Sequence, residues 1–268
     1  RTKEVVEQKE KIEEINKDLT DSINYAKRIQ LQLLPEKENF KSILPSSFVL
    51  YNPKDIVSGD FYWIKEDDKE IILACADCTG HGVPGGFMSM ISSILIHEAV
   101  EFHNKTIPSE ILSVVDINIR NILHQKDDFD SNKDGMDVGI ININKETSIM
   151  SFSGAIRSCY IYRNSKRLVL KGDRYSIGGY MTTDKKFTTQ NYQLQKGDFV
   201  YLFSDGFPDQ FGGERMRKLK MSGFNNLIDE YSSFPMNQQK EKFSNFITDW
   251  IGEGPQMDDI LLIGFEFL

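Results

Sequence analysis

Four short segments of the sequence combine aspartate with glycine or with a second aspartate, and each adjoins an apolar run that reads as a β-strand. They are residues 58–60 (SGD), 77–82 (DCTGHG), 204–206 (SDG) and 256–259 (QMDD). Carboxylate oxygens are the ligands that Mg²⁺ and Mn²⁺ prefer, and glycine lets a backbone carbonyl approach closely. A single Asp-Gly pair is usually a plain turn. Four such segments at strand ends instead predict a site for divalent cations.

Three further patterns allow other kinds of chemistry. Residues 80–85 (GHGVPG) match the G-x-G-x-x-G pattern of dinucleotide sites, but no second strand ending in an acidic residue follows about twenty residues later. Cys75 and Cys78 match C-x-x-C, yet the next helix begins too far along the chain to lower a thiol pKa. His81 could be a ligand, a general acid or a residue that shapes the turn. We favour the last, because the four histidines show no zinc spacing.

The elements that must position these segments are short strands interrupted by two blocks of helix. Strands are predicted at residues 48–51, 60–65, 70–76, 137–143, 148–153, 158–163, 167–171, 187–194, 198–203 and 260–267. Helices are predicted at residues 83–102, 108–123, 224–231 and 238–250. Runs of strands separated by blocks of helix are typical of the α+β class and not of alternating βαβ units.

The first 34 residues have a different composition, with dense charge and no glycine or proline. Apolar residues recur there every seven positions, with two more between them: Val5, Ile12, Leu19, Ala26 and Leu33, and then Ile15 and Ile29. A heptad pattern predicts a coiled coil and hence a homodimer, although a single amphipathic helix lying on its own domain would show a similar stripe. Pro35 ends the helix. We therefore divide the chain into a helical linker, 1–34, and a domain, 35–268.

The composition excludes several classes of protein. A formal net charge of −8 offers no basic surface for nucleic acid or anionic membranes. The longest apolar run, residues 87–96, is about half of what a bilayer span needs. Three cysteines are too few for a disulfide framework, which favours the cytoplasm. Because residue 1 is an arginine, we expect a longer protein with an upstream sensor, and membrane attachment of that full-length protein is compatible with this.

Six segments, in order along the chain, resemble the SpoIIE and RsbU branch of the bacterial PPM phosphatases. They are residues 58–63 (SGDFYW), 76–82 (ADCTGHG), 136–140 (MDVGI), 153–155 (SGA), 202–207 (LFSDGF) and 256–260 (QMDDI). The resemblance covers residues 22–268 and implies a four-layer αββα sandwich. It also implies a protein serine/threonine phosphatase that uses two divalent ions, Mn or Mg. The implied substrate is a phosphorylated anti-sigma-factor antagonist of the STAS type.

The resemblance also implies a role for each matching residue. The catalytic aspartates would be Asp60, Asp77, Asp205 and Asp258, and the same four would bind the cations together with the backbone carbonyl of Cys78. Asp77 would bridge the two cations. Asp259 competes with Asp258 as a ligand, because the pair DD leaves the assignment open. The family usually has threonine where this chain has Leu261, so a hydroxyl near the last ligand is missing here.

Two other functions stay open at this point. A catalytically inactive phosphatase fold could serve as a binding or dimerisation module, and a metal phosphodiesterase could act on a nucleotide. The presence of every expected aspartate favours an active enzyme, and no purine-specific pocket is visible. Residues 22–35 (SINYAKRIQLQLLP) resemble the helix that links an upstream sensor to the phosphatase in this family. We therefore expect the N-terminal helix to control the site.

Overall fold

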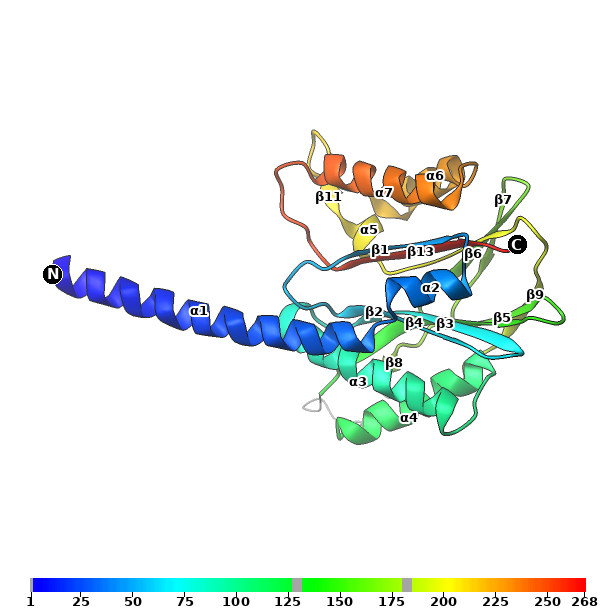
Figure 1. Cartoon of the computed structure of the whole chain (residues 1–268), viewed down its shortest axis with the longest axis horizontal. Coiled ribbons are helices and arrows are strands. Elements are labelled where there is room, and N and C mark those ends of the chain that lie inside the picture. The colour runs from blue at the N-terminus through cyan, green and yellow to red at the C-terminus, as the bar shows by residue number, and fades with distance from the viewer. Residues whose placement is uncertain (1, 127–131, 180–184) are drawn as a thin grey trace.

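The computed structural model describes residues 2–126, 132–179 and 185–268. Two β-sheets lie face to face, with one pair of helices over the outer face of each sheet (Figure 1). This arrangement confirms the predicted α+β class and the four-layer αββα sandwich. It arises because each sheet has two apolar faces, and each face must be covered by the other sheet or by helices.

The first sheet carries two of the four predicted site segments. Its strand order is β2-β3-β4-β5-β9, with the short β8 paired to β4, and every pairing is antiparallel. The strands are β2 (Asp60–Glu66), β3 (Glu70–Cys78), β4 (Gly135–Asn144), β5 (Ile149–Ala155), β8 (Ile177–Gly178) and β9 (Gln190–Gln193). An antiparallel sheet of this kind contains no βαβ unit, so the topology excludes a dinucleotide site at residues 80–85.

The second sheet carries the other two segments. Its order is β1-β13-β10-β6-β7, again with antiparallel pairings. The strands are β1 (Ser47–Asn52), β6 (Cys159–Arg163), β7 (Lys166–Leu170), β10 (Phe199–Phe203) and β13 (Ile260–Glu266). A separate two-stranded ribbon is formed by β11 (Phe211–Gly212) and β12 (Arg217–Lys218). Because β10 and β13 pair directly, the segments at residues 204–206 and 256–259 lie at one end of this sheet.

Helices cover the outer faces and divide the core into two clusters. α3 (Gly82–Glu101) and α4 (Pro108–Ile122) lie on the first sheet, and α6 (Lys220–Tyr231) and α7 (Met236–Ile251) lie on the second. The larger cluster fills the space between the sheets and under α3 and α4. The smaller one, which is rich in aromatic rings, fills the space under α6 and α7. Each fully buried large apolar side chain contributes about 1.5–3 kcal/mol to this packing.

α3 is apolar on nearly all sides because it is covered on more than one side. Within the described residues it is long and apolar enough, by length and composition alone, to cross a membrane. However, 56% of that apolar window is buried inside the domain. This is the burial expected of a core helix in a layered fold.

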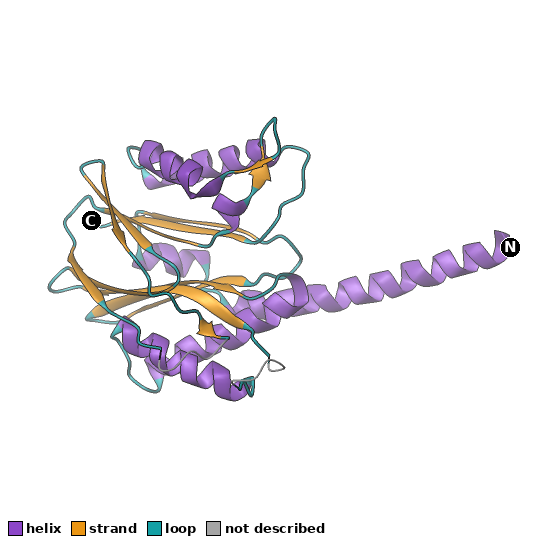
Figure 2. Cartoon of the chain, turned by 180° about the vertical axis from the view of Figure 1, so that it is seen from behind, coloured by secondary structure: helices purple, strands orange, loops and turns teal. Residues whose placement is uncertain are grey.

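α1 (Thr2–Leu33) projects from the body of the domain, as Figures 1 and 2 show. Residues 3–22 are exposed throughout, including the part of the predicted heptad stripe that they carry, with Ile12 58% and Leu19 57% exposed. The last turns of α1 instead pack beside α3, where Gln30 is buried. The dimer stays a prediction, and an unpartnered apolar stripe is what such a dimer would require.

Most predicted elements are present within a few residues of their predicted ends. The sequence pattern did not predict α2 (Lys37–Ile43), α5 (Gly206–Asp209), β8 or the β11–β12 ribbon. All of these are short, and a segment of two to seven residues is too short to show a clear apolar period. β9 is four residues long, where eight were predicted, because only residues 190–193 pair with β5.

Candidate active site

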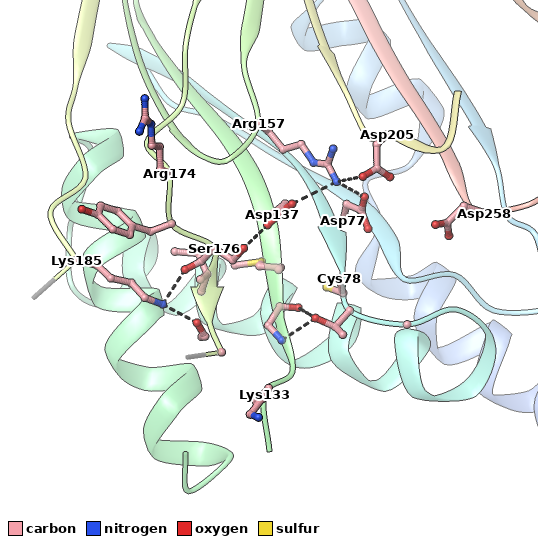
Figure 3. A pocket seen from close by; sticks show the side chains of 18 of the residues that line it. Asp77, Cys78, Lys133, Asp137, Arg157, Arg174, Ser176, Lys185, Asp205 and Asp258 are labelled. Atoms are coloured by element: carbon pink, nitrogen blue, oxygen red, sulfur yellow. Dashed lines mark hydrogen bonds and ion pairs between the residues drawn. The ribbon is translucent and has the colours of Figure 1, made fainter. Parts of the chain in front are cut away.

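A pocket of about 610 Å³ opens at the end of the sandwich where the predicted site segments meet. Figure 3 shows Asp77 at the end of β3, Asp205 just after β10 and Asp258 just before β13, with Cys78 beside them. Residues up to 181 positions apart are thus brought to one place (77 to 258). The two sheets make this possible because both place the relevant strand ends on the same side.

Asp60 and Asp77 stand directly opposite each other on the paired strands β2 and β3. Asp60 is only 1% exposed and does not line the pocket, and its carboxylate accepts a hydrogen bond from Ser204 Oγ at 2.6 Å. Burial raises the pKa of Asp60 well above its usual range, and the nearby Asp77 raises it further. Burial likewise raises the pKa of Asp77 to about 8. Two carboxylates this close call for a positive charge between or beside them.

The adjacent Asp258 and Asp259 occupy different environments. Asp258 lines the pocket, and burial raises the pKa of its carboxyl group. Asp259 is 3% exposed and points inward, where its two carboxylate oxygens accept hydrogen bonds from the backbone N–H groups of Lys54 and Gly59, each at 2.7 Å. The geometry therefore assigns Asp258 to the pocket and gives Asp259 the task of joining two loops.

Arg157 lines the pocket, although nothing in the sequence pattern pointed to it. Its Nη2 donates hydrogen bonds to Asp77 Oδ2 at 2.5 Å and to Asp205 Oδ2 at 2.9 Å, and it lies 3.4 Å from Asp137 Oδ2. Asp137 belongs to the MDVGI segment, which was recognised only as part of a pattern. No local signal marks Arg157, because its partners lie far away in the sequence, on β3, on β4 and just after β10.

A second wall of the pocket is held by a buried lysine. Lys185 Nζ lies 3.0 Å from Asp116 Oδ1 of α4, and both side chains are 3% exposed. The same ammonium group donates to the backbone carbonyls of Ser176 and Gly178, which fixes β8 over α4. Ser176 Oγ in turn donates to Asp137 Oδ1 at 2.6 Å. This wall is therefore linked through Asp137 to the carboxylates around Arg157 (Figure 3).

The remaining candidates behave as structural residues. Cys75, Cys78 and Cys159 are free and buried, and burial raises the pKa of the Cys75 and Cys78 thiols, which opposes a redox role. His81 lines the pocket, and its Nδ1 lies 2.8 Å from Asp55 Oδ2, so the ring braces the turn that leads into α3. This contact agrees with the turn-shaping role favoured from the sequence.

The side chains around the pocket differ from a preformed site for a pair of divalent cations. Within the described ranges, no three Asp, Glu, His or Cys side chains converge as a ready-made ligand cluster. A guanidinium group lies between Asp77 and Asp205 instead. The pocket nevertheless offers oxygen donors from four aspartates, Asp77, Asp137, Asp205 and Asp258. Two backbone carbonyl oxygens, those of Cys78 and Gly80, also lie close to Gly59. A Cβ added at Gly59 would come within 3.1 and 2.5 Å of them. Oxygen-rich sets of this kind suit hard divalent cations.

Comparisons with known proteins agree with this geometry. The model of the stage II sporulation protein E (SpoIIE) family matches residues 67–268, and no curated protein matches the chain. The solved SiaA-PP2C domain of Pseudomonas aeruginosa is 31% identical, with 95% of this chain and 99% of that chain covered and a TM-score of 0.85.

Two more distant structures show the shared fold alone. One contains the PP2C phosphatase domain and a fragment of the regulatory domain of SpoIIE from Bacillus subtilis. It is 16% identical, with 83% of this chain and 63% of that chain covered and a TM-score of 0.63. The other is RsbX in complex with magnesium, at 17% identity, 82% and 94% coverage and a TM-score of 0.55. The chain therefore belongs to the SpoIIE family, and it is a PP2C-type protein serine/threonine phosphatase domain with the PPM fold.

Proposed function

We propose that this domain hydrolyses phosphoserine or phosphothreonine on a regulatory protein with the help of two divalent cations, Mn or Mg. The observation that supports this most directly is the meeting of Asp77, Asp205 and Asp258 around one pocket. The magnesium found with RsbX, which has the same fold, is consistent with it. When bound, two such ions lower the pKa of an attacking water and neutralise charge on the phosphoryl oxygens.

In this proposal the chain's own residues hold and orient the ions. Asp77, Asp205, Asp258 and the carbonyl of Cys78 supply oxygens from the pocket, and Asp60 supplies one from behind it. Ser204 Oγ fixes the orientation of the Asp60 carboxylate through its hydrogen bond at 2.6 Å. Asp259 acts indirectly. Its carboxylate accepts hydrogen bonds from the backbone N–H groups of Lys54 and Gly59 and so holds the loop that precedes Asp60. We do not assign Asp259 as a ligand.

The substrate in this proposal is a phosphorylated STAS-type anti-sigma-factor antagonist. Membership of the SpoIIE family supports a regulatory protein as substrate. The pocket wall opposite the aspartates presents Arg174 and Tyr175, both exposed, to an approaching protein surface. We place the reaction in the cytoplasm, in keeping with the three free cysteines.

We further propose that an upstream sensor controls the site through α1. Gln30, buried near the end of α1, contacts α3 and the loop that precedes β2. Its Nε2 donates to the carbonyl of Ser58 at 2.6 Å and to Ser89 Oγ of α3 at 2.7 Å. Its Oε1 accepts a hydrogen bond from the Ser58 N–H at 3.1 Å, and Ser58 Oγ accepts one from the N–H of Asp60. A shift of α1 would therefore act on the strand that carries Asp60.

Phosphate release from a panel of phosphorylated STAS proteins, with Mn²⁺ and with EDTA, tests the proposed activity. We expect release from at least one substrate that requires Mn²⁺. Release of phosphate from none of them, by a folded protein that binds Mn²⁺, would favour the alternative of a binding or dimerisation module. Hydrolysis of a nucleotide phosphodiester instead would favour the phosphodiesterase.

Two variants test control by α1. Gln30→Ala removes the contacts to Ser58 and Ser89, so we expect it to change the Mn²⁺ concentration needed for half-maximal activity. Gln32→Ala is the matched control, because Gln32 is exposed on the same helix.

Deletion of residues 1–20 should weaken dimerisation and also shift the Mn²⁺ dependence. A truncated protein that stays dimeric by light scattering, with unchanged Mn²⁺ dependence, would exclude α1 as both dimer contact and switch.

A further inference from the structure

The Arg157 side chain lies at the centre of the carboxylates and is only 13% exposed. A single nitrogen, Nη2, makes all of its contacts with Asp77, Asp137 and Asp205 (Figure 3). The guanidinium group thus takes the position between Asp77 and Asp205 that a cation bound by both residues would need. Because like charges repel, the guanidinium group and a divalent cation would compete for these two carboxylates.

The backbone that carries Arg157 is held in an unusual conformation. Ile156 has a φ of +64°, a left-handed value that a β-branched residue rarely adopts. Its N–H donates to the carbonyl of Asp173 at 2.9 Å, and the Arg157 N–H donates to the carbonyl of Ala155 at 2.7 Å. A Cβ at Gly154 or Gly172 would come within 2.0 or 2.3 Å of the Arg157 carbonyl oxygen. Such strain persists only where the surroundings enforce it, and it is common at functional sites.

The guanidinium group also has N–H donors that do not contact the aspartates. Its Nε is buried and has no hydrogen-bond partner among the residues that the structure describes. A buried donor without a partner is costly and calls for an explanation. A guanidinium group presents its N–H donors as a planar fork that suits the oxygens of a phosphoryl group. Contact through Nη2 alone leaves most of that fork unused.

We propose that Arg157 exchanges partners during the reaction cycle: it pairs with Asp77 and Asp205 when cations are absent, and with the substrate's phosphoryl oxygens once cations hold those carboxylates. Arg157 is then both a competitor of the cation and a catalytic residue that contacts substrate. The strained turn keeps its backbone fixed, so the side chain can leave the carboxylates without leaving the pocket. This inference rests on the proposed two-cation phosphatase function.

Binding of Mn²⁺ and of inorganic phosphate to the full chain tests the exchange without any measurement of turnover. Arg157→Gln removes the competing charge, so we expect Mn²⁺ to bind about tenfold more tightly by calorimetry. In EDTA this variant should melt at a lower temperature than the wild type, because the carboxylates lose their counter-charge. In saturating Mn²⁺ that difference should disappear.

Arg157→Lys separates the two halves of the proposal and serves if the glutamine variant does not fold. Lysine keeps the positive charge but loses the planar fork. We expect Mn²⁺ affinity within about twofold of the wild type and phosphate affinity for the Mn²⁺-loaded protein about tenfold lower. Arg163→Gln is the matched control. This variant breaks an ion pair outside the pocket, in which Arg163 Nη2 lies 2.6 Å from Asp198 Oδ2. It should change neither the Mn²⁺ affinity nor the phosphate affinity.

The outcomes distinguish this inference from the proposed function. If the wild-type chain binds no Mn²⁺, the two-cation function itself is wrong. If the wild type binds Mn²⁺ and Arg157→Gln binds it equally well, the competition is overturned while the two-cation function stands. If Arg157→Lys binds phosphate as tightly as the wild type, contact between Arg157 and the phosphoryl group is overturned.

Discussion

The five aspartates predicted to form the site fall into two regions that differ in what their carboxylates contact. In the pocket, Asp77 and Asp205 contact a guanidinium group, and Asp258 lies beside them. Behind the pocket, Asp60 and Asp259 are almost fully buried and accept hydrogen bonds from a hydroxyl group and from backbone N–H groups. The aspartates of both regions come from the same set of short segments at strand ends.

The role of each aspartate therefore depends on the groups that its carboxylate contacts, and not on the sequence motif around it. A carboxylate whose two oxygens both accept backbone N–H bonds is stabilised in its charged form by those N–H groups and joins the loops that carry them. A carboxylate in a pocket among other carboxylates still needs a positive charge. Asp258 and Asp259 show this most clearly, since they are neighbours in sequence and fall on opposite sides of the division.

The largest effect should come from the pocket region. Replacement of Asp77 by Asn keeps the shape of the side chain but removes the charge that the cations need, so we expect Mn²⁺-dependent phosphate release to fall by about 10²–10³-fold or more. Asp205→Asn should behave in the same way. Circular dichroism should show that both variants fold. Wild-type turnover in either variant would contradict the cation assignment.

The adjacent pair Asp258 and Asp259 allows the two regions to be compared directly. Asp258→Asn should lower activity by at least about tenfold and leave the free energy of unfolding almost unchanged. Asp259→Asn should lower the free energy of unfolding by about 1–3 kcal/mol, because a carboxamide offers only one acceptor oxygen for two N–H groups. Urea unfolding and phosphate release from the same preparations check both results. The reverse pattern would show that the two roles have been exchanged.

A smaller effect is expected from pH in the absence of cations. A carboxyl group whose pKa is raised by folding binds its proton more tightly in the folded state, so its ionisation destabilises the fold. The pKa of Asp77 is raised to about 8, so the EDTA-treated protein should lose stability as pH rises from about 4 to about 8. Saturating Mn²⁺ should remove most of this dependence. Thermal melting across this range, with and without Mn²⁺, measures it.

The smallest effect should follow from changing Cys75 and Cys78 together to Ala. Both thiols are buried and have raised pKa values, and the proposed chemistry uses only the backbone carbonyl of Cys78. We expect turnover close to wild type and a stability loss of about 1 kcal/mol for each substitution. A large loss of turnover in a folded variant would point to thiol chemistry.

The sequence predicted most of the fold because long elements carry a clear apolar period. β3, α3, α4 and β13 were all found within two residues of their ends. The short elements α2, α5 and β8 were missed, since their positions depend on what they pack against. β8 is an example, because it is held over α4 by Lys185, which is more than sixty residues from Asp116 in sequence.

The sequence by itself determined which residues could bind cations, because carboxylates beside glycine at strand ends are a local feature. Only the tertiary structure decided which of them share a pocket. It turned Asp258 toward the pocket and Asp259 away from it, because backbone N–H groups of Lys54 and Gly59 bind the Asp259 carboxylate behind the pocket. It also brought in Arg157, whose position among three aspartates depends on a strained turn at Ile156 and on strands from both sheets. Long-range pairing of this kind leaves no periodic signal in the chain.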